Sequence, residues 1–123
     1  MDRIDRASGL ISAGEMAVVI MTDGHLFIQN TDNTGESGNW RINKNRTQRL
    51  NKVIIFIQKN NSDVREIFIA DYLGIHSPMP SDQYKTIGRV VFDLINIREV
   101  GFTTENWSRF AETGSYPVRY LTK

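Results

Sequence analysis

The chain of 123 residues contains no cysteine. This absence excludes a disulfide framework, a zinc site built from thiolates and a cysteine nucleophile. A sequence without cysteine suits a reducing compartment, so we expect the protein to be cytoplasmic.

Long hydrophobic runs are missing as well. The longest one spans residues 16–21, whereas a membrane helix needs about 20 apolar residues and the apolar part of a signal peptide about 7–15. We therefore expect neither a secretion signal nor a membrane as a partner.

Histidine is scarce, and His25 and His76 are the only two. Neither belongs to a recognisable catalytic arrangement, and the sequence has no His-x-x-x-His pair, P-loop or Gly-x-Ser-x-Gly turn. We therefore expect no metal, no cofactor and a protein that binds without catalysis. The alternative is a small nucleic-acid-processing enzyme that uses His25 or His76 as its acid or base.

A strong net charge is also absent, since the formal value is only +1 at pH 7. The chain as a whole therefore lacks the charge of a generic polyanion binder. Its basic residues are unevenly distributed, however. Residues 37–62, the basic stretch, contain six Lys or Arg and no Asp or Glu, whereas the first 36 residues contain six acids and two arginines. This stretch predicts either a phosphate-contacting surface or a solvated loop.

What the sequence does contain is strong β-strand patterning. Residues 53–57 are a continuous β-branched and aromatic run, which predicts a strand buried on both faces. Residues 64–74 predict a second strand that forms a hairpin with the first, and Asp71 shares one of its faces with apolar residues. Residues 89–100 are apolar on both faces for most of their length, as expected in a curled sheet or a barrel wall.

The segments before residue 37 predict a helix and a hairpin. Apolar residues recur at helical spacing between residues 2 and 12, which indicates a short amphipathic helix. Residues 17–21 and 26–28 flank Asp23-Gly24, a pair typical of a hairpin turn.

The C-terminal part predicts a loop, a helix and a strand. Prolines interrupt residues 75–81, so this segment should form a loop. Thr103 or Thr104 could cap a short helix that Gly114 ends. Residues 116–121 then predict an edge or closing strand.

Taken in order, these segments resemble the PUA-like fold, and within it the EVE and YTH branch. The resemblance covers residues 38–121, and it depends on Trp40 in an aromatic-bearing strand and on the closing Pro117-Val118-Arg119-Tyr120 strand. It implies a mixed α/β (α+β) domain with a strongly curved β-sheet or a small β-barrel of PUA-like type and short flanking helices. We expect residues 1–123 to form a single domain, with residues 1–37 as an N-terminal extension.

The same resemblance implies a function. This branch includes the DNA-reading domains of some modification-dependent restriction systems, and its members take a modified base, flipped or single-stranded, into a cage of aromatic and polar side chains. The chain would accordingly be a non-catalytic reader of DNA or RNA, and a nuclease or AAA+ effector could supply any activity.

Two sets of side chains are candidates for this task, because a base needs an aromatic face and hydrogen-bonding groups and a phosphate needs a cation. The expected base-pocket residues are Trp40, Asn43, Asp71, Tyr72, Trp107, Arg119 and Tyr120. The expected phosphate-binding residues are Arg41, Lys44, Arg46, Arg49 and Lys52.

Structural roles remain open for the same residues. Trp107 lies on the apolar face of the predicted helix and Trp40 in a polar segment, so either ring could belong to the core. Tyr120 could be buried with its hydroxyl paired. Asp71 could accept from a backbone or arginine donor, and Arg119 could form an ion pair. A protein-interaction domain is a third hypothesis, which salt-sensitive binding to nucleic acid would contradict.

Overall fold

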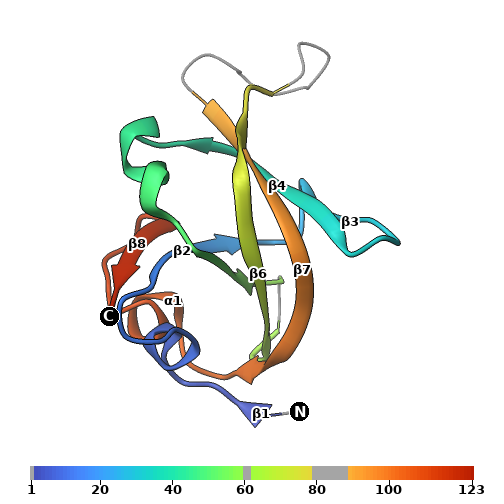
Figure 1. Cartoon of the computed structure of the whole chain (residues 1–123). Coiled ribbons are helices and arrows are strands. Elements are labelled where there is room, and N and C mark those ends of the chain that lie inside the picture. The colour runs from blue at the N-terminus through green and yellow to red at the C-terminus, as the bar shows by residue number, and fades with distance from the viewer. Residues whose placement is uncertain (1, 60–61, 79–88) are drawn as a thin grey trace.

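A computed structural model describes residues 2–59, 62–78 and 89–123, which form one mixed β-sheet with short helical segments (Figure 1). The strands in chain order are β1 (Asp2–Arg3), β2 (Met16–Thr22), β3 (Phe27–Gln29), β4 (Thr34–Arg41), β5 (Lys52–Ile57), β6 (Arg65–His76), β7 (Arg89–Thr103) and β8 (Val118–Thr122). The helical segments are the 3-10 helices η1 (Ala7–Leu10) and η2 (Lys44–Arg49) and the α-helix α1 (Trp107–Phe110).

The sheet has the strand order β3-β4-β7-β6-β5-β2-β8, and β1 pairs with the end of β7. The β1–β7 and β2–β5 pairs are parallel and the other pairs are antiparallel. The sheet curls in Figure 1, but within the described residues its edge strands β3 and β8 do not pair with each other. The structure therefore agrees with the expected α+β class, and the barrel alternative is wrong because the sheet is not closed.

Bulges between β6 and β7 help to curve the sheet. The register of this long antiparallel pair shifts at three places, and an extra residue on one strand bends it and increases its twist. At one shift Asn96 has a φ of 57°, and its side-chain amide donates to Asp71 Oδ2 at 2.8 Å. Asparagine tolerates this left-handed conformation better than most residues, so Asn96 suits the bend in β7.

The central strands bury both faces, which confirms the prediction for residues 53–57. On β5, Ile54 and Phe56 belong to a first core that η1 and α1 cover, whereas Val53 and Ile55 belong to a second core inside the curl. Side chains of β2 and β6 alternate between the same two cores. The predicted hairpin is also confirmed, because β5 and β6 pair antiparallel.

The predictions for the N-terminal segments are mostly wrong. In place of a helix over residues 2–12, the chain begins with β1 and only residues 7–10 form a helical turn, η1. The strands on either side of Asp23-Gly24 exist but do not form a hairpin, since β2 pairs with β5 and β8 while β3 pairs with β4. Residues 1–37, expected as an extension, contribute β2 and β3 to the same sheet as the rest of the chain.

The C-terminal predictions agree more closely with the structure. The helix is present but short, and Asn106, rather than a threonine, caps it by accepting from the backbone N–H of Arg109. The last strand is an edge strand, β8, which pairs with β2 alone among the described strands. Strand β6 continues through His76, and the end of the predicted loop, residues 79–81, lies outside the described residues. No helix in the described part of the chain is long and apolar enough to cross a membrane.

Candidate functional site

A basic pocket lies where the end of β4 and η2 approach β8. Its volume is about 390 Å³, within the range of small-molecule sites, roughly 300–1,000 Å³. The lining residues are Arg41, Ile42, Asn43, Arg46, Thr113, Tyr116, Val118, Arg119 and Tyr120. Five of the expected site residues are therefore brought together here: Arg41, Asn43, Arg46, Arg119 and Tyr120.

The local sequence explains how the η2 side of the pocket forms. Asn43 Oδ1 accepts a hydrogen bond from the backbone N–H of Asn45 at 2.9 Å, so Asn43 caps η2. This turn redirects the chain between β4 and β5. It places Arg46 over the ring of Tyr120, with the guanidinium carbon 4.1 Å from the ring centroid. The cation–π contact links two segments that are far apart in the sequence.

Tyr120 is half-buried, and its hydroxyl oxygen is buried without a hydrogen-bond partner in the described structure. Burial raises the pKa of this hydroxyl, and the charge of Arg46 acts in the opposite direction. The group is therefore protonated at neutral pH and keeps its capacity both to donate and to accept a hydrogen bond.

Tyr116 is a pocket residue that the sequence did not single out. Its hydroxyl donates to the backbone carbonyl of Arg41 at 2.7 Å, and its own carbonyl accepts from Trp107 Nε1 at 2.9 Å. These bonds join the end of β4 to the loop between α1 and β8. Tyr116 is 56% exposed, so it offers an accessible aromatic surface beside the arginines. The only sequence signal was its place directly before Pro117.

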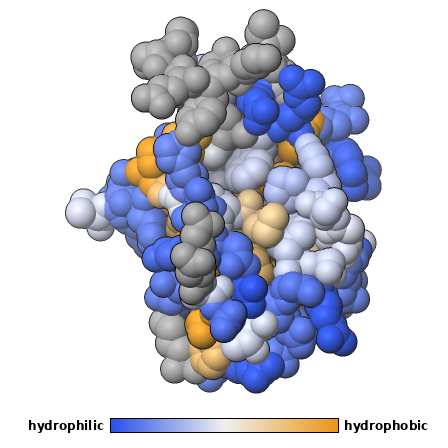
Figure 2. All heavy atoms as spheres, turned by 180° about the vertical axis from the view of Figure 1, so that it is seen from behind, coloured by the Kyte–Doolittle hydropathy of each residue, from blue (hydrophilic) through white to orange (hydrophobic). Residues whose placement is uncertain are grey.

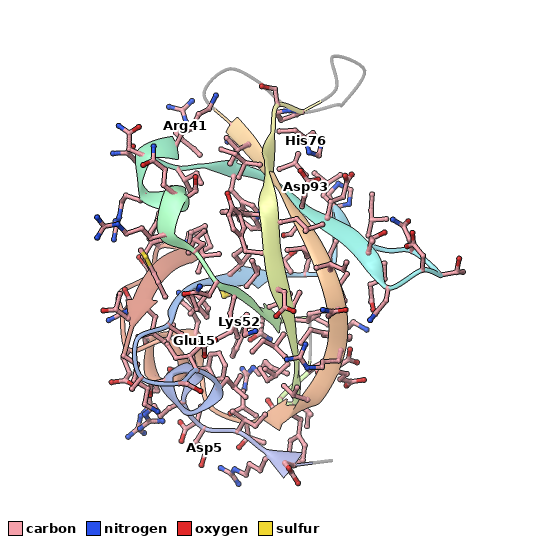
Figure 3. The ribbon with its side chains drawn as sticks, in the orientation of Figure 1. Asp5, Glu15, Arg41, Lys52, His76 and Asp93 are labelled. Atoms are coloured by element: carbon pink, nitrogen blue, oxygen red, sulfur yellow. The ribbon has the colours of Figure 1, made fainter. Side chains whose placement is uncertain are left out.

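Three guanidinium groups give the pocket its charge. Arg119 donates to the carbonyls of Glu112 and Tyr120, at 3.1 and 2.8 Å, which fixes its orientation. Arg41, at the upper end of β4 in Figure 3, makes no side-chain hydrogen bond or ion pair with the described residues. The lining contains no carboxylate, so the arrangement favours an anion, and its planar donors suit a phosphate or the edge of a base.

Lys44 and Arg49 lie on η2 beside the pocket but are not among its lining residues. Both side chains are exposed and make no ion pair with the described residues. They share η2 with the lining residue Arg46.

Two expected base-pocket aromatics lie next to the second core instead. Trp40 and Tyr72 are partly buried against it, and neither lines the pocket. Trp40 Nε1 donates to Ser37 Oγ at 3.0 Å, and the Tyr72 ring meets Phe92 edge-on at 6.3 Å. Their contacts in this structure are therefore with the interior of the curled sheet.

Trp107 belongs to the first core. It is 6% exposed and packs edge-on against Phe56 at 5.5 Å. Its ring does not line the pocket, but its N–H positions Tyr116.

Asp71 and Lys52 lie away from the pocket and bind each other. They are directly opposite on β5 and β6, and their side chains form an ion pair. Lys52 Nζ also lies 3.9 Å from Glu15 Oε2. Both residues are labelled in Figure 3. Hydrogen bonds from Lys52 and Asn96 hold the pKa of Asp71 below its usual value. Lys52, which was expected to bind phosphate, therefore interacts with two carboxylates in this structure.

The lowered pKa predicts how Asp71 affects stability with pH. A carboxylate with a depressed folded-state pKa stabilises the fold above its unfolded pKa of about 4, and this contribution is lost as pH falls through the folded value. Asp71→Asn should therefore destabilise the protein at about pH 6, and the difference from wild type should shrink as pH falls to about 2. Urea unfolding across this range measures the effect.

The control for this prediction is Asp63→Asn, because the Asp63 carboxylate makes no hydrogen bond or ion pair with the described residues. A constant difference between Asp71→Asn and wild type at every pH would contradict the assigned role.

No protein-family model matches the chain, and no curated protein or solved structure matches it. The resemblance to PUA-like, EVE and YTH domains therefore stays a prediction.

Proposed function

We propose that the protein is a non-catalytic nucleic-acid-binding module that takes a flipped or single-stranded base, in DNA or RNA, into the basic pocket. One observation carries the proposal. Three arginines, two tyrosines and no carboxylate line a single pocket between η2 and β8. This combination matches the needs of a nucleotide, whose base stacks on aromatic rings and whose phosphate binds guanidinium groups.

The roles follow from exposure and existing bonds. Tyr116 is the stacking surface, because its ring is the most exposed aromatic of the lining. Arg41 and Arg46, with Lys44 and Arg49 of η2, bind backbone phosphates. Arg119, already fixed by two carbonyls, faces the polar edge of the base, and the Tyr120 ring under Arg46 forms part of the pocket wall. A modification on the base would be read at this edge, and a nuclease or AAA+ partner would perform any subsequent reaction.

Other surfaces favour a protein-interaction domain less. Among the described residues outside the pocket, the large exposed hydrophobic ones are Ile28 on β3, Val64 directly before β6 and Leu73 in the second half of β6. On the face shown in Figure 2, hydrophilic residues dominate and apolar ones appear in separate areas. Scattered apolar residues of this kind are normal on a monomer surface.

The test is the binding of labelled oligonucleotides by the full chain. Single-stranded and duplex DNA and RNA, with and without base modifications, are compared by fluorescence anisotropy at low salt. Tyr116→Ala should weaken binding to the preferred strand by about 1–3 kcal/mol, since that is the contribution of one stacked base. Tyr116→Phe keeps the ring and should retain most of the affinity.

Two results would contradict the proposal. The first is a wild-type chain that binds none of these oligonucleotides at low salt. The second is equal binding by wild type and a folded Tyr116→Ala variant. Cleavage or base conversion by the purified chain, abolished by His25→Ala or His76→Ala, would favour the enzyme alternative instead.

A further inference from the structure

A second cluster of polar side chains lies outside the basic pocket. Glu36, His76 and Asp93 come from β4, β6 and β7, three neighbouring strands. Asp93 is directly opposite Glu36 in the β4–β7 register, and His76 reaches Asp93 from β6. Figure 3 shows the side chains of His76 and Asp93 close together. One ligand atom from each of the three residues can be chosen so that all three lie within 4.8 Å of one another.

We propose that this cluster binds one divalent first-row transition-metal ion, for which Zn²⁺ is the reference. Imidazole nitrogen is a ligand for zinc and its neighbours in this series, and carboxylate oxygens complete such sites. A hard ion such as Mg²⁺ prefers oxygen ligands alone, so the histidine argues for the transition-metal class.

The two carboxylates lie next to different ring nitrogens of His76, and a single ion would bind one of these nitrogens. His76 Nδ1 lies 2.9 Å from Asp93 Oδ1, and His76 Nε2 lies 3.7 Å from Glu36 Oε2. Ligand atoms bound tetrahedrally to one zinc at about 2.0–2.2 Å are separated by roughly 3.3–3.6 Å. The three side chains are each about 40% exposed, so small rotations can bring one atom of each around a common centre.

The electrostatics also favour a cation. Carboxylates directly opposite each other on neighbouring strands repel and destabilise the pair. Among the described residues, His76 is the only side chain that forms a hydrogen bond or an ion pair with either Glu36 or Asp93. A bound metal ion would neutralise both carboxylates. Three protein ligands would also leave coordination positions open for water or a phosphate oxygen.

Local spacing patterns predicted no metal because they compare residues within one short segment. These ligands come from three strands and meet only through sheet register. The site shares no residue with the basic pocket, so the inference does not rest on the proposed function.

The experiment is a titration of the metal-free full chain with ZnCl₂, followed by calorimetry and by nitrogen NMR of the histidine rings. We expect one zinc per chain, a shift of the His76 ring nitrogens without a comparable shift of His25, and a higher melting temperature with zinc. His76→Gln, Asp93→Asn and Glu36→Gln should each lower zinc affinity at least tenfold. Magnesium should bind more weakly than zinc.

The matched control is Glu99→Gln, which removes another exposed carboxylate from β7 and should leave zinc affinity unchanged. Circular dichroism establishes that each variant is folded. The absence of stoichiometric zinc binding by the wild type would overturn the proposal. Zinc affinity equal to that of the wild type in all three ligand variants would also overturn it, as would an NMR shift confined to the ring nitrogens of His25.

Discussion

The triple substitution Arg41→Gln, Lys44→Gln and Arg46→Gln is expected to weaken binding to a single-stranded oligonucleotide about 100-fold at 0.1 M salt. Each phosphate contact on a single strand adds about 0.7 to the slope of log affinity against log salt, so three lost contacts flatten the slope by about 2. Over the tenfold change from 1 M to 0.1 M salt, this slope difference amounts to a factor of about 100. Anisotropy titrations at several salt concentrations measure both quantities.

The chain offers a matched control of equal charge change. Arg3, Lys59 and Arg109 lie outside the pocket and each forms an ion pair with an acid. Their replacement by glutamine should change the salt slope much less, because no phosphate contact is lost. If both triple variants flatten the slope equally, the binding is a property of overall charge and the pocket has no special role.

The strands that were predicted correctly are those with a strong local signal. Residues 53–57 could hardly form anything other than a buried strand, because β-branched and aromatic side chains occupy both faces. The hairpin with β6 followed from a short polar connection. The hairpin at Asp23-Gly24 failed because turn preference is local, whereas both edges of β2 are occupied by β5 and β8.

Several residues of the pocket could be predicted from the sequence, but the fact that they meet in one place could not. The basic stretch and the Arg119-Tyr120 pair stood out in the sequence, but their contact depends on how far the sheet curls, which bulges in β6 and β7 influence. The same limitation affected Asp71. Its place on a largely apolar face was visible, but its ion pair with Lys52 depends on cross-strand register.

Trp107→Ala is expected to have the largest effect on the fold itself. The ring is buried in the first core against Phe56, and a buried tryptophan or phenylalanine replaced by alanine costs about 3–5 kcal/mol of unfolding free energy. Such a loss is a large fraction of the stability of a domain of this size. Urea unfolding followed by circular dichroism measures it.

Trp107→Phe separates the packing role of the ring from its support of the pocket. Phenylalanine fills most of the cavity but cannot donate to the carbonyl of Tyr116, so the stability loss should fall to about 1 kcal/mol, the net contribution of one hydrogen bond. Because that bond positions Tyr116, oligonucleotide affinity should still decrease. Trp40→Phe, which removes a comparable N–H bond to Ser37 outside the pocket, is the control. Unchanged affinity in a folded Trp107→Phe variant would show that Tyr116 needs no support from the core.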